Sequence, residues 1–291
     1  MKKALSILTA GCLAVSLAAC GSTAASSAAS AADSTASAAE STAASDTAAA
    51  DGQTYKVGIC QLVQHVALDA ATQGFKDALT EQLGDAVTFE EKNAQGDSNT
   101  CTTIINGFVS DNVDLILANA TPALQAAQAG TNTIPVLGTS VTEYGVALGI
   151  DDFDGLVGTN ISGTSDLAPL DEQAGIIKEL FPDAKTVGLL YCSAEPNSQY
   201  QVDTVKASLE ELGYTCEYYA FSDSNDLASV CQKAADENDA VYVPTDNTVA
   251  ANTGIVDGIC RPAKKPVFAG EEGICSGCGV ATLSISYYDL G

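Results

Sequence analysis

From Tyr55 onward, short runs of β-branched and aliphatic residues alternate with longer amphipathic segments. The short runs predict strands at residues 55–60, 86–90, 114–118, 134–137, 186–190, 215–220, 240–243 and 266–269. The intervening periodicity predicts helices at about residues 66–83, 101–110, from Thr121 onward, 168–181, 199–212, 227–238 and 248–260. Strands that are separated by single helices predict parallel sheets with right-handed crossovers.

A glycine-rich stretch at residues 138–163 interrupts this pattern and divides it into two similar halves. We therefore expect an α/β fold of two doubly wound parallel-sheet lobes, with a hinge and a cleft between them. The expected boundaries are 54–150 for the N-terminal lobe, 151–165 for the crossover or hinge, 166–280 for the C-terminal lobe and 281–291 for a return segment.

The N-terminus has the pattern of a secretory signal at residues 1–19, with Lys2 and Lys3 before an apolar run. Because Cys20 directly follows small residues, the site resembles a bacterial lipobox, which implies cleavage before Cys20 and its acylation. An ordinary signal peptide with an incidental cysteine is the alternative. Residues 20–53 are mostly Ser, Ala and Thr, which predicts a disordered tether.

Charge and composition exclude several functions. The chain has 12 Lys and Arg against 37 Asp and Glu, a net charge of −25, which disfavours binding to nucleic acid or to anionic lipid. Arg261 is the only arginine, and neither a Walker A loop nor a GxGxxG motif is present. Tryptophan is absent, so stacking of sugars on indole rings is excluded as well.

Eight cysteines lie beyond Cys20, most of them within apolar runs where they would act as small hydrophobic residues. Cys275 and Cys278 form a CxxC motif, for which we expect either a local disulfide or two free thiols. A redox pair and half of a metal site are the alternatives. Because no second CxxC exists and His65 is the only histidine, we expect no metal site.

In open parallel sheets, ligands bind beyond the carboxyl ends of the strands, so the residues after each predicted strand are candidates for a site. Hydroxyl, amide and carboxylate groups follow seven of these strands. The candidates are Gln61, His65, Asn119, Thr121, Ser140 and Thr142 in the first half, and Glu195, Asn197, Asp246, Asn247 and Glu271 in the second. Each could equally be a helix cap, but together they favour a small polar ligand.

Several segments resemble a bacterial family of ABC-transporter substrate-binding proteins related to TrpX. These are Val57-Gly58-Ile59 with Gln61, His65, Leu68-Asp69 and Gly74-Phe75, and the runs at 93–97, 138–142, 163–166, 195–198 and 244–247. The resemblance covers residues 55–291 and implies a type 1 periplasmic-binding-protein fold. It also adds Thr164 and Asp166 to the candidate site. Relatives continue beyond the equivalent of Gly291, so we expect the chain to be truncated there.

The resemblance implies an extracytoplasmic, lipid-anchored protein that captures a small polar solute, such as an amino acid and in particular an aromatic one. It would deliver the solute to a permease and its ATPase. We expect a monomer without cofactor, catalytic residues or enzymatic activity. As a hypothesis, Asn119, Thr121, Ser140 and Thr142 bind the α-carboxylate, and Asp246 or Glu271 binds the α-ammonium group. A ligand-sensing receptor of the same fold and a thiol-exchange protein using Cys275 and Cys278 are the alternatives.

Overall fold

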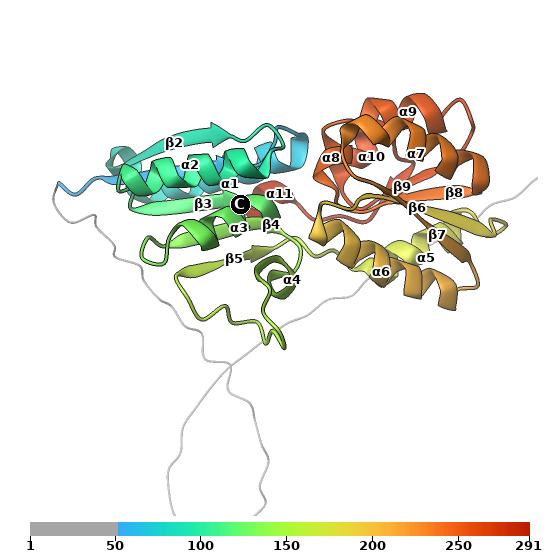
Figure 1. Ribbon diagram of the computed structural model, residues 1–291, viewed down its shortest axis with the longest axis horizontal. Helices are drawn as coiled ribbons and strands as arrows, with labels where there is room; N and C mark the ends of the chain where they lie inside the picture. The colour runs from blue at the N-terminus through green and yellow to red at the C-terminus, as the bar shows by residue number, and fades with distance from the viewer. Residues whose placement is uncertain (1–51) are drawn as a thin grey trace, which may run out of the picture. The chain divides into compact units, whose positions relative to one another are not determined.

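The computed structural model describes residues 52–291 (Figure 1). The predicted signal peptide, Cys20 and nearly all of the predicted tether lie outside these residues. The first lobe contains a parallel sheet in the order β2-β1-β3-β4-β5. Its elements are β1 (Tyr55–Gln61), α1 (Val66–Leu83), a 3₁₀ turn (Gly84–Ala86), β2 (Val87–Asn93), α2 (Ser98–Ser110), β3 (Leu115–Asn119), α3 (Thr121–Gly130), β4 (Val136–Val141), α4 (Tyr144–Leu148) and β5 (Ile161–Ser165).

The second lobe contains a parallel sheet in the order β10-β9-β8-β6-β7. Its elements are α5 (Leu170–Leu180), β6 (Thr186–Cys192), α6 (Pro196–Glu211), β7 (Thr215–Phe221), α7 (Ser224–Glu237), β8 (Ala240–Val243), α8 (Asn247–Ala250), α9 (Thr253–Cys260), β9 (Val267–Ala269), α10 (Glu272–Cys278) and β10 (Ala281–Thr282). Two five-stranded parallel sheets confirm the predicted two-lobed α/β class.

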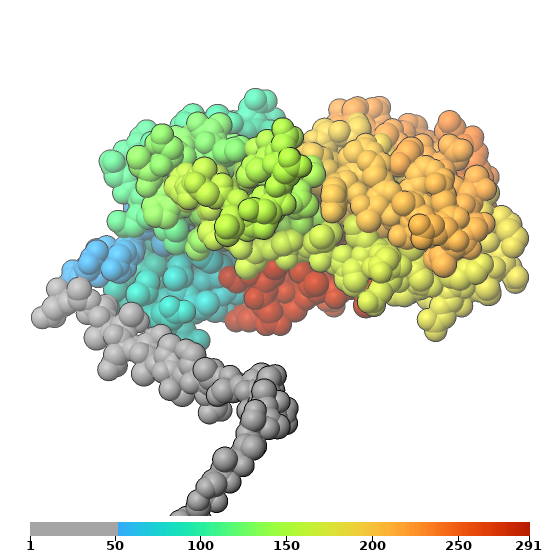
Figure 2. Space-filling view, turned by 90° about the horizontal axis from the view of Figure 1, so that it is seen from below, coloured from blue at the N-terminus to red at the C-terminus, as the bar shows by residue number. Residues whose placement is uncertain are grey.

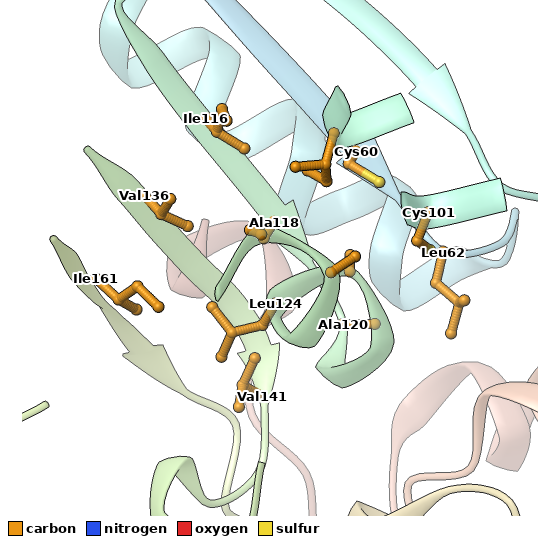
Figure 3. Close-up of a cluster of buried hydrophobic side chains, with 14 of the residues drawn as sticks. Cys60, Leu62, Cys101, Ile116, Ala118, Ala120, Leu124, Val136, Val141 and Ile161 are labelled. Atoms are coloured by element: carbon orange, nitrogen blue, oxygen red, sulfur yellow. The ribbon is translucent and has the colours of Figure 1, made fainter. Parts of the chain in front are cut away.

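Helices cover both faces of each sheet, which explains why the central strands are almost entirely apolar. In β1, Val57 and Ile59 belong to one buried cluster, whereas Cys60 contributes to the cluster on the opposite face. The second face is formed with α2 and α3, and Figure 3 shows Cys60, Cys101 and Leu124 in this cluster. Because successive side chains of a strand point to opposite faces of the sheet, one strand contributes residues to the hydrophobic cores on both sides.

The C-terminal segment leaves the second sheet after β10 and ends in α11 (Tyr287–Leu290) against α1 of the first lobe. Tyr287 is buried there with Ala67 and Ala71. Figure 2 shows this segment in red beside the blue-green residues of the first lobe. Residues 281 and 282, the first two of the expected return segment, extend the second sheet as β10.

The structure differs from the predicted elements in three places. Residues 151–165, expected as a crossover, contain β5, so the passage to the second lobe begins after Ser165. The helix expected at 248–260 is divided into α8 and α9. The short elements α4, α10, β10 and α11 were not predicted. Within residues 52–291, none of the helices combines the length and the hydropathy that crossing a bilayer requires.

Candidate ligand-binding cleft

A cavity of about 240 Å³ lies between strand ends of the two lobes. From the first lobe it is lined by Leu62 and Val63 after β1 and by Pro122 at the start of α3. From the second lobe it is lined by Glu195 before α6 and Asn247 at the start of α8, among others. The carboxyl ends of both sheets therefore border one cavity, as the topology predicts.

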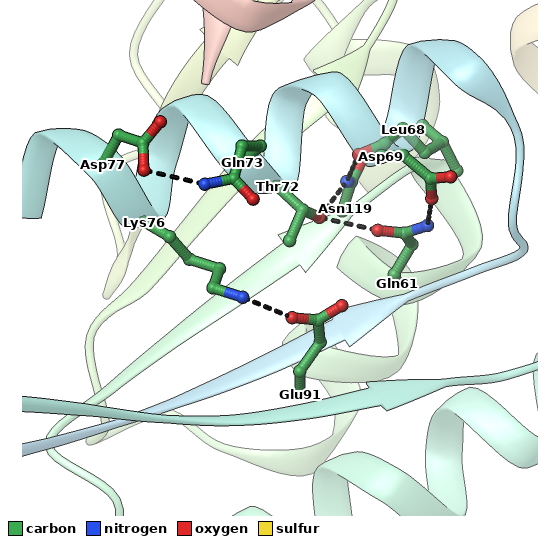
Figure 4. A network of polar contacts seen from close by, with 9 residues as sticks. All are labelled: Gln61, Leu68, Asp69, Thr72, Gln73, Lys76, Asp77, Glu91 and Asn119. Carbon is green, nitrogen blue, oxygen red and sulfur yellow. Dashed lines mark hydrogen bonds and ion pairs between the residues drawn. The ribbon is translucent and has the colours of Figure 1, made fainter.

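On the first-lobe side, a buried network fixes α1 against the strand ends (Figure 4). The Gln61 amide donates to Asp69 Oδ1 at 2.7 Å and accepts from Thr72 Oγ1 at 2.6 Å. The Asn119 amide nitrogen donates to Thr72 Oγ1 and to the Leu68 carbonyl, both at 2.9 Å. These bonds use the whole Gln61 amide and the donors of Asn119, so both predicted residues are held rigidly.

Five predicted site residues carry a buried polar atom that lacks a hydrogen-bond partner among the described residues. They are Asn119 Oδ1, Ser140 Oγ, Asp166 Oδ1, Asn197 Oδ1 and His65 Nδ1. A buried polar group without a partner costs roughly 1–3 kcal/mol, so such groups are rare in folded proteins. Their gathering at strand ends of both lobes indicates a site that a polar ligand completes.

The backbone at the first-lobe strand ends is strained. Ala120, directly after β3, has φ +87°, and Ser140, the penultimate residue of β4, has φ +54°. Neither residue is glycine, and such conformations persist only where the surroundings enforce them, commonly at ligand sites. No side chain caps the start of α3, and Pro122 occupies its first turn. The free amide groups at this end of α3 are therefore suited to a carboxylate.

Asp166 follows β5 and is 3% exposed. Its Oδ2 accepts a hydrogen bond from the Tyr287 hydroxyl at 2.8 Å, whereas Oδ1 has no partner. Burial raises the pKa of this carboxyl, although the hydrogen bond from Tyr287 opposes the rise. None of the ion pairs within residues 52–291 involves Asp166. The carboxylate therefore lacks the cation that a buried negative charge requires.

The three second-lobe carboxylates are occupied within their own lobe. Glu195 accepts from the backbone and side chains of Asn247 and Thr248 at 2.7–2.9 Å. Asp246 accepts from the Val249 amide at 2.9 Å and the Cys192 amide at 2.7 Å. Glu271 caps α10. Asp246 and Glu271, the expected ammonium partners, therefore already accept a backbone hydrogen bond on each of their oxygens and have less free acceptor capacity than Asp166.

Burial also changes the acidity of these groups. Desolvation, together with the nearby charge of Glu195, raises the pKa of Asp246 to about 8. Desolvation likewise raises the pKa of Glu271, against the two backbone hydrogen bonds that it accepts. Asp246 thus acts as a buried cap that can be protonated near neutral pH.

Two side-chain hydrogen bonds join the lobes directly. His65 Nε2 lies 3.2 Å from Asn247 Oδ1, and Gln201 Nε2 donates to Thr142 Oγ1 at 3.2 Å. Burial lowers the pKa of His65, which keeps its imidazole neutral at neutral pH. These two contacts hold the strand ends of the two lobes together.

The remaining predicted residues divide by exposure. Thr121 is 2% exposed at the start of α3. Thr164 is exposed and bonds instead to Thr139 Oγ1 and to the Leu290 carbonyl. Sequence reasoning missed Gln201 and Tyr287, since neither directly follows a predicted strand. A tyrosine in the expected return segment was the only available signal for Tyr287.

All eight described cysteines are free thiols. Burial raises the pKa of Cys275, and that of Cys278 to about 12, so neither is an activated thiolate. Cys278 Sγ donates to the Ile274 carbonyl at 3.3 Å. Among residues 52–291, no cluster of three or more His, Cys, Asp or Glu side chains is arranged to hold a metal ion.

The family described as ABC transporter substrate binding protein matches residues 56–291. The chain belongs to this family. An ABC transporter substrate-binding protein binds solute between two lobes, which agrees with the position of the cleft. The expected family and the type 1 periplasmic-binding-protein fold are both confirmed. A leucine binding protein from Thermotoga maritima, at 14% identity and a TM-score of 0.58, shares the fold. So does a branched-chain amino acid transporter substrate binding protein from Streptococcus pneumoniae in complex with isoleucine, at 17% identity and a TM-score of 0.53.

This substrate-binding protein is 35% identical, over 295 residues, to a tyrosine-binding protein of Clostridioides difficile strain R20291, covering 100% of this chain and 81% of that protein. It is 33% identical to the ABC domain solved in complex with L-Trp from Streptococcus pneumonia, with a TM-score of 0.78, and 82% and 81% of the two chains are covered.

A ligand-free, open substrate-binding protein with adhesive properties from Clostridium difficile is 37% identical, over 81% of this chain and 82% of that one. Its TM-score is only 0.57, although its sequence identity exceeds that of the L-Trp complex. The structure of this substrate-binding protein is therefore closer to that of a ligand-bound relative. The two hydrogen bonds between the lobes agree with such a closed arrangement.

Proposed function

We propose that this protein captures an L-amino acid with an aromatic side chain and supplies it to an ABC importer. The observation that carries the proposal is the unpaired, buried Asp166 Oδ1. An α-ammonium group would provide the missing cation and hydrogen-bond donor. A charge-assisted hydrogen bond of this kind contributes roughly 1.5–3 kcal/mol.

The α-carboxylate would bind Ser140 Oγ and the free amides at the start of α3. Support comes from the unpartnered Ser140 hydroxyl, the uncapped helix and the strained backbone at Ala120. Partial positive charge at a helix N-terminus favours a carboxylate. This donor set and Asp166 together distinguish the two ends of a zwitterion.

The side chain would extend toward the cavity near Leu62, Val63 and Pro122, which offers apolar surface beside polar groups. A volume of about 240 Å³ is close to the lower bound of roughly 300 Å³ for small-molecule sites, which suits a single amino acid. The tyrosine-binding relative and the relative solved with L-Trp favour an aromatic side chain.

Calorimetry with L-tyrosine, L-tryptophan, L-phenylalanine and L-leucine tests the side chain. Two analogues test the zwitterion: N-acetyl-L-tyrosine lacks the ammonium group, and tyramine lacks the carboxylate. We expect the aromatic amino acids to bind, and both analogues to lose at least about tenfold in affinity. Equal binding of N-acetyl-L-tyrosine and L-tyrosine would remove Asp166 from the proposed role.

The proposal includes a lipid anchor on Cys20 and an extracytoplasmic position, facing a permease and its ATPase. Its support is the basic and apolar N-terminus that ends in small residues before Cys20. The long Ser/Ala/Thr segment that follows would let the binding domain reach the permease. The protein would act as a monomer that closes on its ligand.

A further inference from the structure

Five of the eight described thiols gather in one core of the second lobe, and Cys192 is one of them. Cys231 on α7 and Cys260 on α9 belong to the same buried cluster as Cys278 on α10, and Cys275 packs against it. Within this group, Cys231 Sγ and Cys260 Sγ are 3.7 Å apart. Their side chains are 0% and 1% exposed.

This distance is close to the geometry of a covalent bridge. A disulfide has a sulfur–sulfur length of about 2.05 Å, so the two sulfur atoms would need to approach by roughly 1.7 Å. Both residues lie on helices that pack together through this cluster. Such a bond requires this approach of the two side chains and of the helices that carry them.

We propose that Cys231 and Cys260 are a redox pair that forms a reversible disulfide between α7 and α9. In the reaction, both thiols lose their protons and together give up two electrons, and one sulfur–sulfur bond forms. A small-molecule disulfide such as oxidised glutathione takes up the two electrons and two protons, its own sulfur–sulfur bond breaks, and two thiols leave.

Because Cys231 and Cys260 are buried, the disulfide can form only when these residues become accessible. An external disulfide cannot reach thiols that are almost fully buried, so oxidation occurs during folding or through local opening of α7 and α9. The bond would enclose residues 231–260, which include β8, the buried cap Asp246 and the start of α8. Oxidation would therefore restrain the segment that carries Asn247 toward the cleft.

The test uses the wild-type chain refolded from denaturant with oxidised and reduced glutathione, beside a sample refolded in dithiothreitol. Trypsin cleaves after Lys233, which separates Cys231 and Cys260 into different peptides. We expect the oxidised sample to yield one linked pair of these peptides, which dithiothreitol separates after unfolding. We also expect its melting temperature to exceed that of the reduced sample by about 5–10 °C.

Cys231→Ser should abolish this difference in melting temperature. Cys216→Ser is the matched control, because Cys216 is a buried cysteine on β7, outside the thiol cluster, and this variant should keep the difference. Separate alkylation of Cys231 and Cys260 in the oxidised wild type would overturn the proposal. This peptide measurement does not depend on whether Cys231→Ser folds.

Discussion

The Tyr287 hydroxyl donates a 2.8 Å hydrogen bond to Asp166 Oδ2. Asp166 lies where the chain leaves the first sheet, and Tyr287 lies where it returns to the first lobe after β10. Both side chains are buried, at 3% and 6% exposure. The two passages between the lobes are thus joined at the carboxylate for which we propose the ammonium-binding role.

Tyr287→Phe removes the one hydrogen bond that Asp166 Oδ2 accepts within residues 52–291 and keeps the ring. We expect the free energy of unfolding to fall by about 1–3 kcal/mol, because a buried carboxylate loses its donor. Ligand affinity should fall about tenfold, since Asp166 is no longer oriented. Thermal denaturation and calorimetry measure the two effects.

Tyr288→Phe is the control for this variant. Tyr288 is 48% exposed and its hydroxyl bonds to Asp77 near the surface, so its loss should leave affinity unchanged. If Tyr287→Phe binds ligand as the wild type does, the hydrogen bond is structural only.

Asp166→Asn tests the proposed ammonium partner with nearly constant side-chain volume. We expect affinity for an amino acid to fall by about 10- to 100-fold, because the charge-assisted bond is lost. The ligand-free protein should be as stable as the wild type or more so, since an uncompensated buried carboxylate is removed.

The exposed Asp171→Asn, which makes the same charge change on α5, should bind normally. Calorimetry of both variants measures ligand affinity, and thermal melts measure the stability of the ligand-free proteins. Wild-type affinity in Asp166→Asn would contradict the assignment.

The central strands were predictable because they are buried on both faces and therefore read as apolar runs. Two of the edge strands, β5 and β10, were not predicted, whereas the edge strands β2 and β7 were. β5 has the sequence Ile-Ser-Gly-Thr-Ser and buries only Ile161, and β10 has two residues. The short helix α10, with glycines at 273 and 277, was not predicted either. Its Gly277 is required by a close contact, since a Cβ there would lie 2.3 Å from Thr253 Oγ1 of α9.

The location of the site followed from topology, whereas the roles of its residues did not. Asp166 and Asp246 are both buried acids that follow strands, and the sequence favoured Asp246 for the ammonium-binding role. The two carboxylates differ in the hydrogen-bond donors that surround them. Backbone amides of Cys192 and Val249 occupy Asp246, and Asp166 keeps one free oxygen. That difference depends on the three-dimensional positions of distant segments.

Asp246→Asn should flatten the dependence of stability on pH. The pKa of Asp246 is raised to about 8 in the folded protein, against about 3.9 in an unfolded chain. Between these values the folded state binds more protons, so the free energy of unfolding of the wild type falls as pH rises from 5 to 8. The variant lacks this group and should lose less stability over the same range.

Melting temperatures of both proteins at pH 5, 6, 7 and 8 provide the comparison. The lowered pKa of His65 gives an opposite trend below about pH 6.5, but it is common to both proteins and cancels. Parallel curves would contradict the raised pKa of Asp246. Asp246→Ala, which removes the hydrogen bonds to the Cys192 and Val249 amides, should destabilise the fold.

Cys20→Ser tests the lipid anchor. Replacement of the thiol by a hydroxyl prevents thioether formation, so we expect the protein to lose labelling by a radioactive fatty acid and to leave the membrane fraction. Ligand affinity of the binding domain should not change, because Cys20 lies outside the two described lobes. Cys12→Ser, within the predicted signal, is the matched control and should remain labelled. Fatty-acid labelling of Cys20→Ser would contradict the anchor.

His65→Ala removes the 3.2 Å contact between His65 Nε2 and Asn247 Oδ1, which joins the two lobes. Since a hydrogen bond contributes about 0.5–1.5 kcal/mol, we expect ligand affinity to fall by roughly 2- to 12-fold through loss of the closed form. The adjacent, exposed Gln64→Ala is the control. X-ray scattering with and without ligand should show incomplete compaction of His65→Ala at ligand concentrations that close the control.

A double-mutant cycle with Asn247→Ala measures the coupling between His65 and Asn247. The cycle is needed because Asn247 also donates a hydrogen bond to Glu195. Additive effects in that cycle would mean that this contact does not hold the lobes together.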